Sequence, residues 1–426
     1  MPLSNLAVLN RFLSEDVVQS HFKDKRLHPV HSPRATIYPG KIAQLPAEIL
    51  TIVLGFCVHS GNHNSVTARV PWIFELSHVC HLWRSLIQST RAFWSTIVVD
   101  PSAGGFSIPA LKQHIRHASK CLHLFVAMRE SLGRTDVRVE KEALELLVST
   151  SERWVAAYLE RTHHREVLNL VHNKLPLEEL HCARLVAQRD FIQPFQVAPR
   201  LKQLSSTSLI FRHDLQVPWG QLIVLRVGIF SPAILHAPGL LCLQELYISL
   251  LAPQEPVTIP SLKLLSVAHT LSLGGLVVPS LQRLIVAELP DSEPQPDDNL
   301  SQLEAFTART PSISSLSITS TFRSPAALAR IFRSLPSLTA ATFHIQGFDD
   351  ALLVVLRDHT IASQITELGF QLHGADLDEG MLRQLQEMLI VRAQHTSLAS
   401  LSWFGSRLPE STAALLGHFV DLKYVV

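Results

Sequence analysis

The sequence predicts an α/β protein in which a short N-terminal helical segment precedes a long array of repeats whose strands form one parallel β-sheet. Three observations support this fold class. A Leu-x-x-Leu pattern recurs from residue 177 to the end of the sequence. Each copy runs into alternating hydrophobic residues, which is typical of a strand with one buried face. Two amphipathic helical stretches lie before residue 90, ahead of the repeats.

The composition is that of a folded protein without a strong electrostatic field. Hydrophobic residues make up 47% of the 426 residues and charged residues 17%, which is enough apolar material for a large core. The 37 Lys and Arg nearly cancel the 36 Asp and Glu, and a net charge of +1 attracts neither nucleic acid nor an anionic membrane. We therefore expect neither nucleic acid nor membrane among the partners.

The sequence lacks the features of a secreted or membrane protein. No apolar run approaches the roughly 18 residues that span a bilayer, and the opening residues 1–5 have no basic start. The five cysteines form no CxxC pair, so we expect buried thiols rather than disulfides or a zinc site. These features predict an intracellular protein of the cytosol, the nucleus or both.

Four regions follow one another along the chain: residues 1–41, 42–97, 98–174 and 175–426. The first is proline-rich at its end and is expected to be a flexible N-terminal region. The second is the helical segment. The third is a connector of helices and a strand that caps the repeats, and the fourth is the array itself.

The helical segment opens with Leu45-Pro46-Ala47-Glu48-Ile49-Leu50. Proline suits the first turn of a helix, and Glu48 in the same turn suits the positive end of the helix dipole. The apolar stripe of Ile49, Val53 and Cys57 predicts a first helix over roughly residues 46–58.

A second helix is expected over roughly residues 73–89. Its apolar positions from Leu76 to Ile87 recur at helical spacing. Phe93-Trp94 and a short strand at residues 97–99 follow, and Asp100-Pro101 ends that strand.

Three submotifs of this segment resemble an F-box, a helical adaptor-binding motif. They are Leu45-Pro46-Ala47-Glu48-Ile49-Leu50, Val79-Cys80-His81-Leu82-Trp83-Arg84 and Phe93-Trp94. The resemblance covers residues 42–97, and residues 59–71 look like the loop insertions of fungal F-box-like proteins. It implies a Skp-type adaptor as partner and, through that adaptor, the cullin of a ubiquitin ligase.

By this resemblance, the adaptor-binding residues are Leu45, Pro46, Ile49, Leu50, Val53, Val79 and Trp83. Buried aliphatic side chains and an aromatic anchor dominate the energy of a helix bound in a groove. Periodicity alone would instead favour packing of the same side chains against the repeats as ordinary core.

The connector is expected to hold two helices, over residues 108–119 and 141–158. Leu122, Leu124 and Val126 between them alternate as an early strand does. The phrase Ser151-Glu152-Arg153-Trp154 also resembles a segment of fungal F-box proteins of this repeat type.

The array resembles leucine-rich repeats in its period. The first positions of successive copies lie between 19 residues apart, from Leu243 to Leu262, and 33 residues apart, from Ile365 to Leu398. Short copies leave room only for an extended or single-turn return, whereas longer copies can hold helices, as at residues 326–332 and 381–389. The asparagine of the usual repeat is largely missing. Stacked copies would bury their leucines in one continuous core.

The residue after the second leucine of each copy points away from that core. In successive copies these residues are Ser205, Arg226, Tyr247, Ser266, Ile285, Ser317, Thr342, Gly369 and Ser402. On this concave face the candidate target-binding residues are Arg226, Tyr247, Ser266, Ile285, Ser317, Thr342 and Ser402, with Arg226 and Tyr247 as candidate anchors. The row is nearly uncharged, which favours a protein target over a phosphate-bearing polymer.

No catalytic residue, metal site or cofactor is predicted. The 22 histidines include His163-His164, yet no His, Cys, Asp and Glu set has a recognised metal-ligand spacing. The sequence holds no nucleophile elbow and no phosphate-binding loop.

These features together predict a non-catalytic substrate-recognition subunit of an SCF-type ubiquitin ligase. It would bind the adaptor through the helical segment and an unknown protein target through the array. Two alternatives stay open: a leucine-rich-repeat interaction scaffold without ligase coupling, and a hydrolase whose site would need a deep polar pocket.

Overall fold

The computed structural model divides into two compact units, one of residues 1–207 with 214–218 and one of residues 208–213 with 219–426. The residues that it describes are 45–60, 73, 76–99, 107–118, 120, 122–128, 137–161, 178–182, 185–186, 198, 200–210, 219–230, 240–250, 256–268, 270–287, 298–319, 324–345, 350–361, 363–372, 379–396, 398–404, 417 and 421–425. The expected N-terminal region 1–41 lies outside them. Among the described residues, no helix is both long and apolar enough to cross a membrane.

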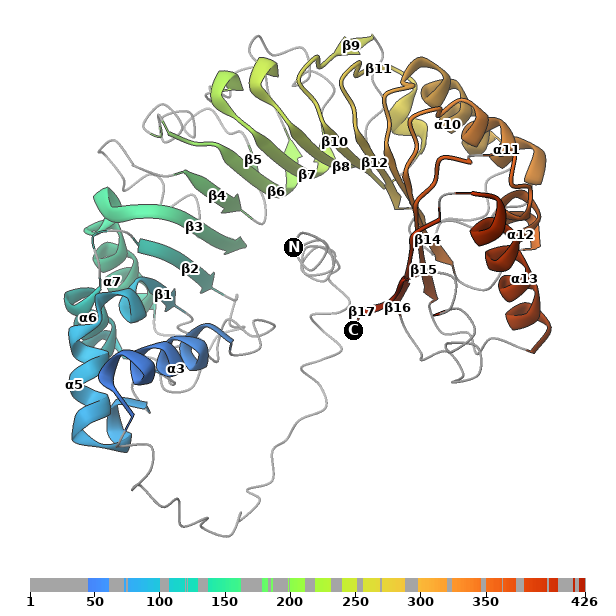
Figure 1. Ribbon diagram of the computed structural model, residues 1–426. Coiled ribbons are helices and arrows are strands. Elements are labelled where there is room, and N and C mark those ends of the chain that lie inside the picture. Colours follow the sequence, from blue (N-terminus) through green and yellow to red (C-terminus); the bar gives the residue numbers. More distant parts are fainter. Residues whose placement is uncertain are drawn as a thin grey trace. The chain divides into compact units, whose positions relative to one another are not determined.

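The described residues of the first unit form four helices beside a parallel sheet. Its helices are α3 (Ala47–Ser60), α5 (His81–Ser89), α6 (Ile108–His117) and α7 (Val137–Val148), with the 3-10 turns η3 (Arg91–Trp94) and η4 (Ser151–Arg153). Its strands are β1 (Thr96–Val99), β2 (Leu122–Met128), β3 (Trp154–Arg161), β4 (Glu179–Cys182), β5 (Leu185–Val186) and β6 (Gln203–Ile210). The sheet runs in the order β1-β2-β3-β4-β6, and β5 pairs with β6. Helices α6 and α7 lie on one side of β1–β3 (Figure 1).

The parallel sheet starts at β1, ahead of the predicted array of residues 175–426. Strands β1, β2 and β3 pair in parallel with one another and then with β4, so the predicted connector supplies sheet strands as well as helices.

Two predictions for this unit are wrong in detail. The second helix is interrupted at Cys80, whose extended backbone (φ −157°, ψ 171°) makes it the N-cap of α5, with Sγ accepting from the backbone N–H of Trp83. The helix expected over residues 141–158 ends at Val148. Thr150 folds back onto the carbonyl of Leu147 (2.6 Å), and the indole of Trp154 donates to its hydroxyl (3.0 Å), so the chain turns into β3.

The second unit is a succession of parallel strands in one register. They are β7 (Val224–Phe230), β8 (Glu245–Leu250), β10 (Leu264–Val267), β12 (Arg283–Ala287), β13 (Ser315–Thr319), β14 (Ala340–Ile345), β15 (Glu367–Leu372), β16 (Ser400–Phe404) and β17 (Asp421–Val425). Their order in the sheet is their order in the chain. Each strand carries one predicted Leu-x-x-Leu copy or the last fragment at residues 422–425, so the mixed α/β fold with a leucine-rich-repeat-like solenoid is confirmed.

The return of the chain depends on repeat length, as predicted. Short copies return through the 3-10 turns η6 (Trp219–Gln221), η8 (Leu240–Cys242) and η9 (Thr270–Leu273) and a small parallel pair, β9 (Val257–Thr258) with β11 (Leu276–Val277). Longer copies return through α10 (Asp298–Arg309), α11 (Pro325–Arg333), α12 (Asp350–Arg357) and α13 (Glu379–His395). Helices α11 and α13 are the two predicted ones. Figure 1 shows α10–α13 together on one face of the sheet.

The core of the second unit has a leucine row and an aromatic row. Leu225, Leu246, Leu265, Leu284, Leu316, Leu368 and Leu401 are all buried. Two residues further along the last strands, the rings of Phe343, Phe370 and Trp403 follow one another at centroid distances of 5.9 and 6.3 Å. Phe332 of α11 meets Phe343 edge-on at 6.2 Å, which joins the helix layer to the sheet.

In the later repeats, Ser and Thr hydroxyl groups bond the backbone carbonyls that the missing asparagines would otherwise bond. The hydroxyl of Ser314 donates to the carbonyl of Gln282, that of Thr339 to Ser314, and that of Thr366 to Thr339, each at 3.2 Å. Two serines that follow a proline ahead of a repeat, Ser261 and Ser312, make a similar bond. Ser312, for example, donates to the carbonyl of Leu281 one repeat earlier (2.8 Å).

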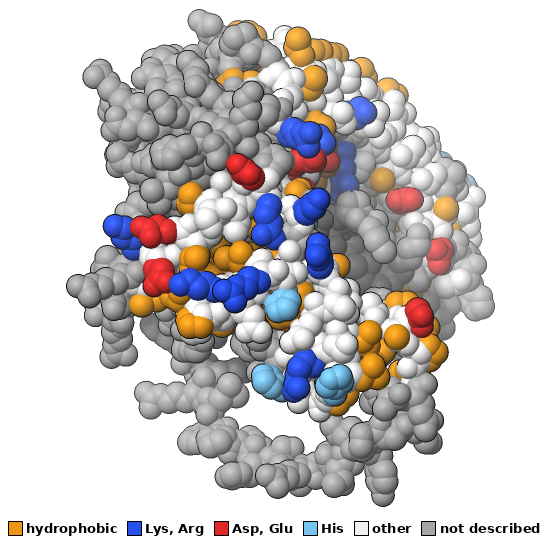
Figure 2. All heavy atoms as spheres, turned by 90° about the vertical axis from the view of Figure 1, so that its left-hand side faces the viewer, with side chains coloured by type: hydrophobic (Ala, Val, Ile, Leu, Met, Phe, Trp, Pro, Cys, Tyr) orange, Lys and Arg blue, Asp and Glu red, His pale blue; other side chains and the backbone are white. Residues whose placement is uncertain are grey.

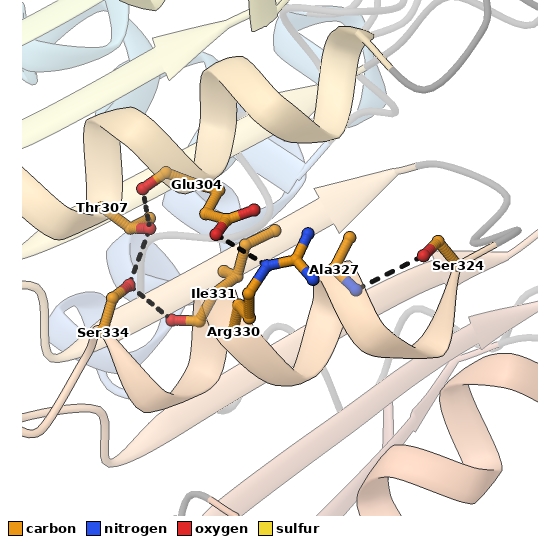
Figure 3. A network of polar contacts seen from close by, with 7 residues as sticks. All are labelled: Glu304, Thr307, Ser324, Ala327, Arg330, Ile331 and Ser334. Carbon is orange, nitrogen blue, oxygen red and sulfur yellow. Dashed lines mark hydrogen bonds and ion pairs between the residues drawn. The ribbon is translucent and has the colours of Figure 1, made fainter.

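Neighbouring return helices are joined by side-chain bonds (Figure 3). Arg330 of α11 donates from Nε to Glu304 of α10 (2.7 Å), and Ser334 donates to the hydroxyl of Thr307 (2.8 Å). Ser324 caps the start of α11 by accepting from the N–H of Ala327 (3.3 Å). The first two contacts connect α10 to α11 on the helical side of the sheet.

Candidate protein-interaction surfaces

Helix α3 buries one side and exposes the other. Pro46 lies just before the helix and accepts from the N–H of Leu50 (3.0 Å). Leu50 and Leu54, one turn apart, are fully buried, while Ile49, Ile52 and Val53 are exposed. The helix is therefore apolar on both sides, and one of these sides faces solvent.

The residues around α5 are arranged in the same way. Ile87 is fully buried, whereas Val79 and Leu82 are exposed. Arg84 donates from Nε to the carbonyl of Ser77 (3.0 Å) and so fastens α5 to the helical residues before Cys80. Helices α3 and α5 contact each other.

The exposed aliphatic side chains gather on this helical segment and form what we call the apolar patch: Leu45, Ile49, Ile52, Val53, Val79 and Leu82. Among the described residues only three other large hydrophobic side chains are exposed: Leu241, Val277 and Val354. Single exposed apolar residues are ordinary, but a cluster on adjacent helices is typical of a contact surface.

The structure divides the predicted adaptor-binding residues into two groups. Leu45, Pro46, Ile49, Val53 and Val79 are exposed and Trp83 is half-buried, so all six are available to a partner. Leu50 is fully buried and belongs to the core of the segment. The sequence reasoning missed Ile52 and Leu82. Helical spacing from Leu45 and Ile49 to Ile52 would have found the first.

The closing Phe93-Trp94 pair is structural. Both side chains are buried, and the Trp94 indole donates to the carbonyl of Ile87 at the end of α5 (2.7 Å). Trp94 also meets the ring of His114 edge-on, with centroids 5.1 Å apart, and His114 Nε2 bonds the Trp94 carbonyl (3.1 Å). Burial lowers the pKa of His114 to about 4, so this histidine is neutral at pH 7. The pair thereby connects α5 to α6.

The predicted target-binding residues form one row in register across the second unit. Arg226 pairs with Tyr247, Tyr247 with Ser266, and Ser266 with Ile285. The row continues through Ser317, Thr342, Gly369 and Ser402 to Lys423. Because the adjacent Phe343 packs on α11, this surface row faces away from the return helices. Ser205, the first member of the predicted row, lies in the first unit, opposite His181 of β4.

The surface row is buried in its middle and carries Arg226 and Tyr247, its largest side chains, at one end. Ile285 and Ser317 are buried, while Arg226, Tyr247, Ser266, Thr342 and Ser402 are half-buried. The Arg226 guanidinium lies over the Tyr247 ring, 4.8 Å from its centroid, and Tyr247 donates to Glu245 (3.1 Å). Burial and Glu245 raise the pKa of Tyr247, so its hydroxyl stays protonated. Among the described residues, Arg226 Nε and Arg283 Nε are buried without hydrogen-bond partners.

Gly369 is required in the surface row by its neighbour. A Cβ at this position would lie 2.9 Å from Thr342 Oγ1 and 3.1 Å from Cγ2. We expect Gly369→Ala to lower the free energy of unfolding by about 1 kcal/mol, because the added methyl overpacks the row.

A double-mutant cycle tests this contact. In the Thr342→Ala background the clash is gone, so Gly369→Ala should become neutral or stabilising by up to about 1 kcal/mol in urea unfolding. Equal costs of Gly369→Ala in both backgrounds would contradict the assignment.

The described residues hold no group of three or more His, Cys, Asp or Glu side chains that could bind a metal ion. The expectation of buried thiols is wrong for Cys80 and Cys242, which are free and exposed. Cys80 is exposed because it serves as the N-cap of α5 at the surface.

The comparisons with known proteins add little to this description. No protein-family model and no curated protein sequence matches the chain. The crystal structure of a TLR13–ssRNA13 complex is similar over 65% of this chain at 13% sequence identity, with a TM-score of 0.38. The similar part spans 46% of that chain. The fold assignment rests on the strand register and the repeat period.

Proposed function

We propose that this protein is a substrate-recognition subunit of an SCF-type ubiquitin ligase. In this proposal the helical segment of residues 42–97 binds a Skp-type adaptor, which links it to a cullin, and the surface row binds a protein target. The apolar patch is the observation that supports it best: six exposed aliphatic side chains lie on the segment whose sequence resembles an F-box.

The physical basis is burial of the apolar patch in a groove of the partner. Fully burying one aliphatic side chain of this size contributes about 1.5–3 kcal/mol. Several of these side chains would have to be buried together for a stable complex, because association costs offset part of the total. Leu50, Leu54 and Ile87 hold the helices together from the other side, so the patch is presented on a supported surface.

The protein would carry out no bond chemistry. The adaptor and cullin would position an activated ubiquitin, and the surface row would hold the target near it. The rate gain would come from a raised local concentration of the target lysine. The half-buried Arg226 and Tyr247 are the strongest anchors the row offers, since Arg and Tyr are enriched among interface hot spots.

Two valines of equal exposure allow a matched test of adaptor binding. Val79 is 60% exposed and lies in the apolar patch, and Val354 is 61% exposed and lies on α12 of the second unit. We expect Val79→Lys to weaken binding of a purified Skp-type adaptor at least about tenfold, or 1.4 kcal/mol, by placing a charge in the apolar contact. Val354→Lys should leave the affinity unchanged. Calorimetric titration with the full chain measures both.

A second matched pair of valines tests whether the loss of adaptor binding extends beyond Val79. Val53 in the patch and Val277 on β11 are both 41% exposed, and only Val53→Lys should weaken binding. Leu50→Ala is unsuitable, because Leu50 is fully buried and its loss would test folding instead. If the wild-type chain binds no adaptor, or if the paired variants behave alike, the ligase proposal fails, and a repeat scaffold without ligase coupling takes its place.

A further inference from the structure

The described residues of α5, η3, β1 and α6, next to the apolar patch along the chain, carry cations and no anions. Among the described residues from 76 to 120 there are five Lys and Arg, and neither Asp nor Glu occurs there. We call these five residues the basic strip: Arg84, Arg91, Lys112, Arg116 and Lys120. The net charge of +1 for the whole chain conceals this local excess.

The charges of the basic strip are left largely unneutralised. All five side chains are exposed. Among the described residues only Lys112 has an ion pair, with Glu142 of α7 at 2.9 Å. Arg84 uses Nε on the carbonyl of Ser77, a bond that leaves its charge uncompensated. Like charges held near one another repel, so an acidic partner would relieve a cost that the free protein carries.

The basic strip is continuous with the apolar patch. Helix α3 contacts α5, α5 contacts η3, and η3 contacts α6. Trp94 of η3 bonds the end of α5 and packs against both His114 and His117 of α6, with the His117 ring 4.8 Å away. Figure 2 shows Lys, Arg and hydrophobic side chains beside one another on this face.

We infer that the partner of this helical face presents a hydrophobic groove bordered by Asp and Glu side chains. The inference rests on the proposed function and adds the chemistry of its partner. Interfaces commonly join an apolar centre to a polar rim. Complementary charges at the rim speed association and select the partner, while the buried centre sets how slowly the complex dissociates.

The exposed side chains argue against nucleic acid and against an anionic membrane surface as the partner of the basic strip. Single-stranded nucleic acid is bound by aromatic side chains on which the bases stack, and membrane surfaces favour exposed Trp and Tyr anchors. Every exposed large hydrophobic side chain among the described residues is aliphatic. Trp83 is half-buried and both Phe93 and Trp94 are buried, so these described residues of the face offer little aromatic surface.

The experiment compares two triple variants of the full chain with the same change in net charge. The first, which we call the strip variant, combines Arg91→Glu, Arg116→Glu and Lys120→Glu and so reverses three of the five charges of the basic strip. The control combines Arg200→Glu, Lys263→Glu and Arg333→Glu, which are exposed positions elsewhere. Association and dissociation rates with a purified Skp-type adaptor are measured at about 50 mM and about 300 mM NaCl, where screening differs strongly. Binding to poly-glutamate, poly-uridine RNA and phosphatidylserine vesicles is measured in parallel.

For wild type we expect the association rate to fall about tenfold from low to high salt. The strip variant should associate about tenfold more slowly at low salt and lose most of the salt dependence, with its dissociation rate within about twofold of wild type. The control triple should match wild type. Adaptor binding that is independent of salt, or equal in the two triples, would overturn the inference while leaving the proposed function intact.

If no adaptor binds, the proposed function fails, and the parallel probes decide the inference. Poly-glutamate that binds wild type but not the strip variant would support an acidic polypeptide partner. Preference for RNA or vesicles, or no binding to any of the three probes, would overturn it.

Discussion

Replacing Arg392 by Leu is expected to lower the free energy of unfolding by about 3 kcal/mol. Arg392 lies on α13 and is fully buried. Its Nε donates to the carbonyl of Leu356 (2.5 Å), and its Nη2 donates to those of Ile361 (2.7 Å) and Asp358 (3.2 Å). These carbonyls lie at or just beyond the end of α12, where a helix leaves its last acceptors without partners. Leu would leave the carbonyls of Leu356 and Ile361 unsatisfied, and each buried orphan costs about 1–3 kcal/mol. The Asp358 carbonyl would keep its bond from the N–H of Ile361 (3.0 Å).

Urea unfolding at pH 7 measures this loss, and a second arginine of α13 supplies the control. Arg383 is exposed and pairs with Glu387 at 3.6 Å one turn away, so Arg383→Leu should cost at most about 0.5 kcal/mol. Arg392→Lys should fall between wild type and Arg392→Leu, because it keeps the charge but loses the planar fork that reaches several carbonyls. Burial lowers the pKa of Arg392 to about 10, which leaves it charged at pH 7. A cost for Arg392→Leu no larger than that for Arg383→Leu would refute this role.

Arg392 is buried and Arg383 is exposed on the same helix, a difference that the sequence does not predict. The residues around 381–389 predict the helix correctly, since its apolar positions recur at helical spacing. A lone arginine on a helix is expected to point to solvent. Only the packing of α12 against α13 brings three backbone carbonyls to Arg392, and no local pattern predicts that contact.

Period and alternation predicted the second unit best. The predicted surface-row residues of this unit do share one register, because a period of two leaves no freedom once the leucines face the core, although Ile285 and Ser317 are buried. The rule that longer repeats hold helices also predicted α11 and α13. Helices α10 and α12 were missed, although the repeats that contain them, from Leu281 to Ile313 and from Leu338 to Ile365, are long enough to hold a helix.

The first unit was harder to predict for two physical reasons. Cys80 interrupts the second helix, and a thiol that caps a helix is not a usual start signal. Residues 154–158 continue the hydrophobic spacing of α7, so the turn that ends this helix at Thr150 was overlooked. The basic strip was missed because its charges lie on separate elements and cancel in the total for the chain.

Lowering the pH from 7 to 5 is expected to destabilise the first unit through His114. The unfolded histidine has a pKa of 6.5, whereas burial lowers the pKa in the folded chain to about 4. As the pH falls below 6.5 the unfolded chain binds the proton first, so unfolding becomes progressively more favourable until the pH reaches about 4. Between the two pKa values of 6.5 and about 4, the free energy of unfolding falls by about 3 kcal/mol in total. Roughly 2 kcal/mol of this stability is lost by pH 5.

The His114→Gln variant separates this effect from other titrations. The Gln side chain carries its amide near the position of Nε2 and can donate to the Trp94 carbonyl, but it does not titrate. The difference in unfolding free energy between wild type and His114→Gln should therefore change by roughly 2 kcal/mol between pH 7 and pH 5. Asp358 cannot produce this change, since its pKa is lowered from 3.8 by bonds from Thr360 and its titration lies below the window. If the difference stays constant with pH, His114 is not the group that senses acid. A real change would mean that mild acid loosens the Trp94 contact between α5 and α6 and, with it, the support behind the apolar patch.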